Sequence, residues 1–126
     1  MKKIMISVAD MNLQAELYGS VTAQKIWDAL PLEGRANVWG DEIYFSIPVS
    51  TELEADARAD VDVGTLGYWE PGRAFCIFFG PTPASIDDQP RAASPVNIFG
   101  HVVDEVTCLR NIRDGERVSV TQDSDE

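Results

Sequence analysis

The sequence has very few of the side chains that bind zinc or act as nucleophiles. It contains one histidine, His101, and two cysteines, Cys76 and Cys108. These residues fall short of the Cys and His patterns of zinc sites, so no metal is expected. A cysteine nucleophile needs a neighbouring base to form its thiolate, and nothing in the sequence places His101 beside either cysteine. Cys76 lies in an apolar run, which predicts a small buried hydrophobe.

Positive charge is also scarce. Ten Lys and Arg residues stand against 21 Asp and Glu residues, which gives a formal net charge of −11. Because such an acidic surface repels phosphate backbones, nucleic acid is not an expected partner. The charge is consistent with a role in keeping the protein in solution.

Long hydrophobic runs are missing as well. No run approaches the roughly 20 apolar residues that cross a bilayer. The N-terminal apolar stretch is only about five residues long and is interrupted by Asp10, whereas a signal peptide needs roughly 7–15. The sequence therefore predicts a cytoplasmic protein without membrane association, whose cysteines are free thiols.

The length indicates one domain. A chain of 126 residues with 44% hydrophobic composition is large enough for a single core. We assign residues 1–121 to this domain and expect residues 122–126 to form a frayed acidic tail. The chain has no internal repeat.

Short strands and turns dominate the predicted elements. The clearest helix spans residues 20–30, because Ser20 or Thr22 can cap its start and Pro31 cannot continue it. A weaker helix is expected over 106–112, a type II turn at Pro71-Gly72, and an exposed excursion over 51–62. Strands are predicted over 3–8, 14–17, 35–38, 42–48, 63–69, 74–79, 96–103 and 116–121. This pattern favours a mainly β barrel or sandwich.

The stretch AFCIFFGPTPAS, residues 74–85, changes abruptly from an apolar strand to a proline-containing loop. In a small barrel, either Phe75, Ile77 and Phe79 or Cys76 and Phe78 fill the interior, and the other set faces a covering element or a pocket. The following connection, 80–95, holds four prolines and is longer than most loops in compact domains. It is either a functional cover over a pocket or a structural flap.

Three blocks of the sequence resemble a known family. They are GDEIYFSIPV at 40–49, VGTLGYWEPGRAFCIFFGPTPAS at 63–85 and QPRAASPVNIFGHV at 89–102. Together they are similar to the prokaryotic cyclophilin-like proteins of uncharacterised function. The resemblance covers most of the chain and implies a closed cyclophilin-like β-barrel of about eight strands with one or two short covering helices.

The resemblance leaves activity open, because folds host several functions. True cyclophilins are peptidyl-prolyl cis-trans isomerases, in which an arginine donates to the prolyl nitrogen. Their Phe-His-Arg and Phe-Met-x-Gln motifs do not occur in this sequence. The barrel also resembles parts of carboxyltransferase and oxoprolinase enzymes, a role that predicts a partner subunit.

Aromatic residues with a polar tip are candidates for a pocket wall. Tyr44, Tyr68 and Trp69 fit this description, since the ring is buried while the hydroxyl or indole N–H meets a ligand. The alternative is that all three are ordinary core or rim aromatics. Glu42 is a candidate base or hydrogen-bond acceptor without an identifiable partner.

Arg91 is the best candidate for recognising an anion or an amide carbonyl, because a guanidinium offers paired donors. The alternative is a salt bridge to Asp87, Asp88 or Glu42. Thr82, like Ser85, either orients a ligand or satisfies loop backbone. The predicted ligand-binding residues are Tyr44, Trp69, Phe75, Phe78, Thr82, Arg91 and Asn97.

The sequence therefore predicts a binding module that takes a small polar molecule or a short peptide in a pocket under the 80–95 loop. Prolyl isomerisation, or a carboxyltransferase or oxoprolinase role, is the alternative. No pair of candidate residues has a spacing that demands catalysis, so no catalytic residue and no cofactor are assigned. A homodimer or a partner subunit stays open.

Overall fold

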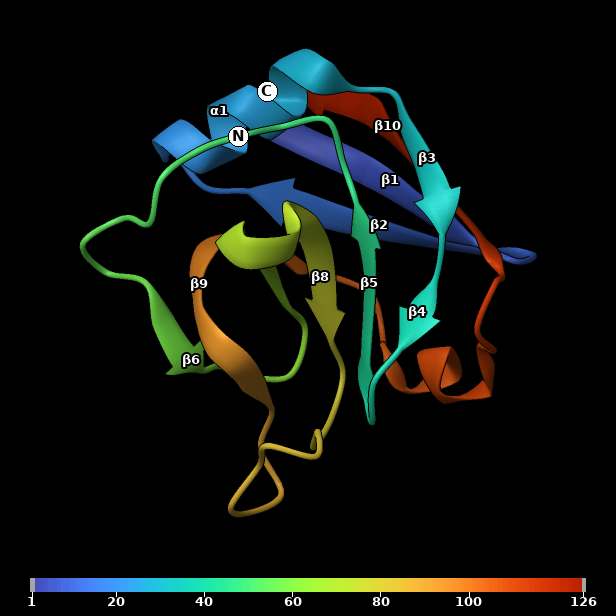
Figure 1. Cartoon of the computed structure of the whole chain (residues 1–126). Coiled ribbons are helices and arrows are strands. Elements are labelled where there is room, and N and C mark those ends of the chain that lie inside the picture. The colour runs from blue at the N-terminus through green and yellow to red at the C-terminus, as the bar shows by residue number, and fades with distance from the viewer. Residues whose placement is uncertain (1, 126) are drawn as a thin grey trace.

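The computed structural model describes residues 2–125, which form a mainly β structure with one α-helix (Figure 1). The helix α1 spans Val21–Ala29, and two 3-10 helices, η1 and η2, span Glu70–Gly72 and Thr107–Asn111. The ten strands are β1 Lys2–Val8, β2 Met11–Leu17, β3 Leu32–Arg35, β4 Asn37–Val38, β5 Glu42–Ser46, β6 Arg58–Asp60, β7 Thr65–Trp69, β8 Ala74–Phe78, β9 Arg91–Val102 and β10 Arg117–Asp125.

All strand pairs are antiparallel, and the sheet runs in the order β3-β10-β1-β2-β9-β7-β8-β5-β4, with β6 attached to β9. The prediction of a mainly β fold is confirmed, but the closed barrel of about eight strands is wrong. The two ends of the sheet are β3 and β4, which are consecutive in the chain with only Ala36 between them. Within the described chain, no strand pairing joins β3 to β4, so the sheet curls without closing into a barrel.

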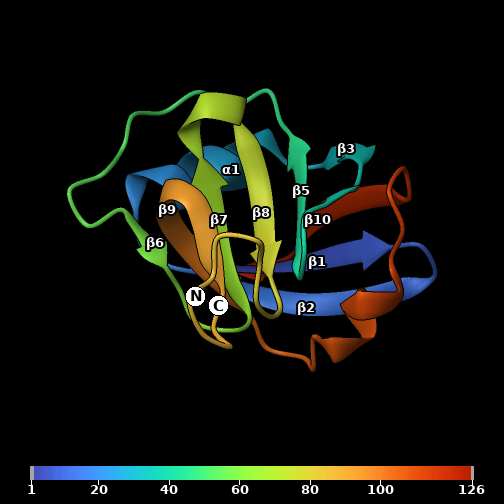
Figure 2. The same cartoon turned by 60° about the horizontal axis from the view of Figure 1, so that its bottom comes forward.

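The curled sheet encloses the main core. Figures 1 and 2 show β1, β2 and β10 crossing the direction of β5, β7 and β8. Inward side chains of both sets of strands belong to one core. The rings of Phe45 and Phe75, which are partners across β5 and β8, lie 5.3 Å apart at the centroids. Phe75 also meets Phe99 edge-on at 5.0 Å. Such aromatic packing adds to the free energy gained from apolar burial alone.

The α1 helix covers one end of this core, as its sequence predicts. The Ser20 hydroxyl accepts a hydrogen bond from the Ala23 N–H at 3.1 Å and so caps the first turn. Ala23 and Ile26 are buried in the core. The helix ends at Leu30, whose backbone is already extended before Pro31.

Strand β8 separates the main core from a second, smaller cluster. Phe75 and Ile77 point into the main core, together with Phe79 just beyond the strand. Cys76 and Phe78 point to the opposite face, where they pack with residues of β9 such as Val96. The first of the two alternatives is therefore the correct one: Phe75, Ile77 and Phe79 fill the main core, and Cys76 and Phe78 face the smaller cluster. The run is apolar throughout because both faces of the strand are covered.

Several local boundaries differ from the sequence prediction. Residues 70–72 form a 3-10 turn, and the left-handed residue is Arg73 at φ 46° instead of the glycine of a type II turn. The weaker predicted helix at 106–112 is the 3-10 helix η2. Strand β9 begins at Arg91, so the long connection ends at Pro90. Strand β10 continues to Asp125 and pairs with Lys2, inside the segment for which we predict a frayed tail.

Within residues 2–125, no helix combines the length and apolarity that a membrane crossing requires.

Candidate ligand-binding cavity

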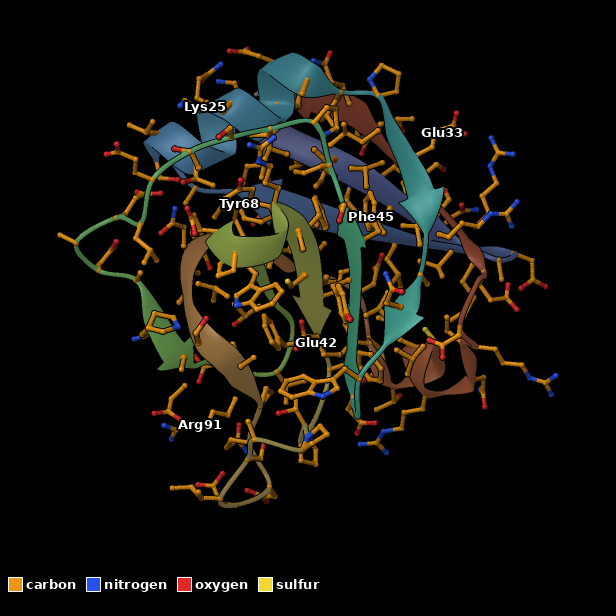
Figure 3. The ribbon with its side chains drawn as sticks, viewed as in Figure 1. Lys25, Glu33, Glu42, Phe45, Tyr68 and Arg91 are labelled. Atoms are coloured by element: carbon orange, nitrogen blue, oxygen red, sulfur yellow. The ribbon has the colours of Figure 1, made fainter. Side chains whose placement is uncertain are left out.

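A cavity of about 220 Å³ opens over the second apolar cluster. Its wall combines large aromatic rings, small alanines and one carboxyl group. The lining residues are Trp39, Glu42, Tyr44, Trp69, Ala92, Ala93 and Val96. An apolar cavity of roughly 150 Å³ can hold benzene, so this space suits a small organic group. Figure 3 shows Glu42 in the interior of the molecule.

Strand β5 places Glu42 and Tyr44 on the cavity side by simple alternation. Ile43 and Phe45 between and after them point into the main core. The turn before the strand adds Trp39, because the Trp39 N–H donates to the Glu42 carbonyl at 2.9 Å and the Glu42 N–H donates back at 3.2 Å. A tight turn thus holds the indole of Trp39 near the carboxyl of Glu42.

The connection over residues 79–90 braces this turn. The Asp41 N–H donates to the Pro81 carbonyl at 2.9 Å, and the Phe79 N–H donates to the Asp41 carbonyl at 2.9 Å. Gly40 has φ +60°, and a Cβ there would lie 2.8 Å from the Thr82 backbone. Glycine is therefore required both by the turn conformation and by the close approach of the loop.

Strands β7 and β9 form the opposite wall. The Trp69 indole N–H donates to the Ser94 hydroxyl at 2.7 Å, which fixes the ring. Gly67 allows Val96 to pack closely, since a Cβ at Gly67 would lie 2.8 Å from the Val96 side chain. Ala92 is buried and Ala93 is exposed. Small side chains on β9 leave the space that the cavity occupies.

Glu42 is the chemically unusual group of the cavity. Its side chain is only 5% exposed, and its Oε1 atom is buried without a hydrogen-bond partner among the described residues. Burial raises the pKa of Glu42 from 4.5 to about 7, while the nearby Cys76 thiol acts in the opposite direction. Burial also raises the pKa of Cys76, and the Glu42 carboxyl raises it further. Glu42 can therefore exchange a proton near neutral pH, whereas Cys76 stays a thiol.

Two of the predicted ligand-binding residues, Tyr44 and Trp69, line the cavity. Arg91 lies at the outer edge of β9 and forms a salt bridge with Asp60 at 3.2 Å (Figure 3). The structure therefore shows the alternative that we gave for Arg91, a salt bridge, but the partner is Asp60 and not Asp87, Asp88 or Glu42. Thr82 is buried and its hydroxyl donates to the Arg91 carbonyl, so it satisfies loop backbone.

The other predicted residues serve the fold around the cavity. Phe75 belongs to the main core, and Phe78 lies in the cluster beneath the cavity. Asn97 is fully buried, and its amide donates to the Glu52 carbonyl at 2.8 Å and to the Thr22 hydroxyl at 3.1 Å. It also accepts from the Glu54 N–H at 2.8 Å. Asn97 thus anchors the segment between β5 and β6.

The sequence prediction missed Trp39, Ala92, Ala93 and Val96 and left Glu42 without a role. A usable signal was present at 42–44, since Glu42 and Tyr44 alternate on one face of a strand that also carries core residues. Trp39 had no such signal, because only the turn brings it to the cavity. Of the predicted 80–95 loop, only Ala92 and Ala93 line the cavity, and the structure places both on β9. Residues 80–90 contribute no lining residue and support the cavity wall.

Comparisons with known proteins define the class. The cyclophilin-like family profile matches residues 2–121. The solution structure of the hypothetical protein AF2241 from Archaeoglobus fulgidus is similar, with 40% sequence identity and a TM-score of 0.82, over 97% of this chain and 95% of that one. The chain therefore belongs to the cyclophilin-like family. Among curated proteins, no relative was found.

A more distant structure shares the fold. McbB, solved in complex with tryptophan, is 18% identical with a TM-score of 0.69. The similarity covers 98% of this chain but only 45% of McbB. At this identity, the comparison supports the fold alone.

Proposed function

We propose that this protein is a binding module whose cavity between β5, β7 and β9 takes a small molecule, or the end of a short peptide, with a flat or compact apolar body and a polar group. The observation that carries the proposal is the Glu42 carboxyl in the wall of an aromatic-lined cavity, whose buried Oε1 atom accepts no hydrogen bond within residues 2–125. Buried polar groups are normally hydrogen-bonded, so a bound molecule is a natural source of the missing partner.

The aromatic wall supplies the rest of the binding free energy. Trp39, Tyr44 and Trp69 are each half-buried, so their rings offer apolar surface to a ligand. McbB, which shares the fold, was solved with tryptophan, a small molecule with an aromatic body and polar ends. Tryptophan is of the ligand size that we propose for the present cavity.

Prolyl isomerisation of the cyclophilin type fits the cavity less well. That chemistry places an arginine against the prolyl nitrogen, and none of the lining residues within 2–125 is basic. Arg91, the candidate for this role, faces outward to Asp60. A binding role that uses Glu42 is therefore the function that the geometry supports best.

The test is an NMR titration of labelled protein with a fragment set of aromatics, amines, acids and X-Pro peptides. We expect shifts confined to the amides of 39–44, 69 and 92–96. Ala93→Leu narrows the cavity from an exposed position, and we expect it to weaken binding by roughly tenfold or more, equivalent to about 1.4 kcal/mol.

The matched control is Ala55→Leu, because Ala55 is also exposed but does not line the cavity. It should leave affinity unchanged. Shifts that map elsewhere, or binding that survives in Ala93→Leu, would contradict the proposal. Exchange spectroscopy on the same peptides tests isomerisation, and we expect no acceleration.

A further inference from the structure

The chemistry of the cavity wall specifies the charge of its ligand. Trp39, Tyr44 and Trp69 surround the same space as the Glu42 carboxyl. An aromatic ring presents a negative face to its surroundings, and a carboxylate adds a full negative charge. Rings of this kind attract ammonium groups, which is how aromatic cages recognise quaternary amines.

No lysine or arginine among the described residues lines this wall. Within residues 2–125, the recorded cation–π contact is between Lys2 and Trp27, at 5.8 Å, away from the cavity. The salt bridges of the described chain involve other acids, such as Asp60, Asp41 and Glu33. The aromatic rings and the ionised carboxyl are therefore complementary to a positive charge, which a ligand can supply.

We propose that the cavity selects a small organic cation, whose ammonium group lies among Trp39, Tyr44 and Trp69 and pairs with the Glu42 carboxylate. This inference rests on the proposed function and narrows its ligand class. The volume of about 220 Å³ admits a head group such as trimethylammonium or a primary ammonium on a small ring. The formal net charge of −11 attracts such a ligand from a distance.

The empty and occupied cavities differ in protonation. A carboxylate buried without a partner is costly, so the empty cavity favours the protonated acid near neutral pH. A cation supplies the missing partner and favours the charged form, so binding releases a proton. The other titratable groups around Glu42 are Tyr44 on the same strand and Cys76 on β8, and Cys76 stays protonated. Asp41, next in sequence, faces Arg110 at 3.5 Å.

Matched pairs of charged and neutral ligands test the inference on the unmodified chain. One pair is choline and its uncharged carbon isostere 3,3-dimethylbutan-1-ol. The other is tryptamine and tryptophol, in which a hydroxyl replaces the ammonium. We expect the charged member of at least one pair to bind about tenfold or more tightly than the neutral member. The affinity of this charged ligand should rise about tenfold from pH 6 to pH 8, because only protein molecules with an ionised Glu42 bind the cation.

Glu42→Gln should abolish the pH dependence and reduce the charge preference to the part that the aromatic rings supply. Glu70→Gln is the control, because it removes the same charge from an exposed acid outside the cavity. It should retain both. Neutral members that bind as well as the cations, or no binding by either charged probe, would overturn the inference. If the inference fails in this way, the fragment titration decides on the proposed function. Other fragments that shift the amides of 39–44, 69 and 92–96 would support a binding cavity without a preference for cations. If no fragment shifts these amides, the proposed function is wrong as well.

Discussion

At the scale of single residues, Glu42 shows how burial changes ordinary chemistry. It is one of 21 acidic residues, yet its side chain is 5% exposed and one oxygen has no partner in the described chain. Apolar surroundings raise its pKa to about 7, because the charged form loses its hydration. The same carboxyl would be an unremarkable solubilising charge on an exposed strand.

This raised pKa predicts a specific pH dependence of stability. The folded state holds a proton on Glu42 that the unfolded chain releases near pH 4.5. Stability of the wild type should therefore fall as pH rises from about 5 to 8, by roughly 3 kcal/mol at most from this group. Glu42→Gln should lack this loss. The free energy of unfolding of the variant should therefore increase relative to that of the wild type as the pH rises toward 8. Urea denaturation at pH 5 and pH 8 measures both values.

The control is again Glu70→Gln, which should follow the wild-type pH profile. If the free energy of unfolding of Glu42→Gln changes with pH in parallel with that of the wild type, the pKa of Glu42 is not raised by folding. The empty cavity would then hold a carboxylate and not the protonated acid.

At the scale of elements, the segment between β5 and β6 is held by side chains instead of by a strand ladder. Asn97 on β9 accepts from the Glu54 N–H and donates to the Glu52 carbonyl. Thr22 on α1 adds a hydrogen bond to the Glu54 carboxylate. One buried asparagine thus connects a helix, a long strand and an irregular excursion, which is a role that its position in the sequence does not reveal.

Asn97→Ala should release this excursion. The change removes the hydrogen-bond partners of the part-buried Glu54 N–H and Glu52 carbonyl, and we expect a loss of about 2–3 kcal/mol in the free energy of unfolding. Amide hydrogen exchange should accelerate at Glu54 by more than this global loss explains. Asn111→Ala, at an exposed asparagine, should change neither quantity. Uniform acceleration across the sheet would show that Asn97 contributes only to global stability.

At the scale of the whole molecule, charge and topology have separate effects. The net charge of −11 acts over distances comparable to the size of the domain at low salt. The sheet topology keeps the two core clusters apart and leaves the cavity over the smaller one. The acidic surface does not determine this arrangement, because net charge influences solubility and association more than fold.

Screening this charge should stabilise the fold. Raising NaCl from 0.05 M to 1 M shortens the Debye length to about 3 Å and weakens repulsion among the acids. We expect a gain of about 1 kcal/mol, or roughly 3–6 °C in Tm for a domain of this size. The double variant Asp56→Lys/Asp62→Lys, at two exposed acids, should respond less to salt. A Tm that falls with salt, or an equal response in the variant, would contradict this account.

The local elements were largely predictable because their signals are local. The cap at Ser20 and the break at Pro31 specify α1, and the apolar run at 74–79 specifies a strand covered on both faces. The family resemblance, carried by residues between 40 and 102, is confirmed over 2–121. Tyr44 and Trp69 were identifiable as candidates because an aromatic ring with a polar tip suits a pocket wall. The same signal was wrong for Tyr68, which lies in the main core and whose hydroxyl donates to the Val49 carbonyl.

What the sequence alone determined about this protein is its mainly β character, its family and its strongly acidic surface. Only the tertiary structure decided that the sheet stays open between β3 and β4 and that Arg91 faces Asp60. It also brought Trp39, Trp69 and the carboxyl of Glu42 around one cavity. The physical reason is that local preference depends on neighbours in the chain, whereas burial, pairing and pKa depend on neighbours in space, which register and packing supply.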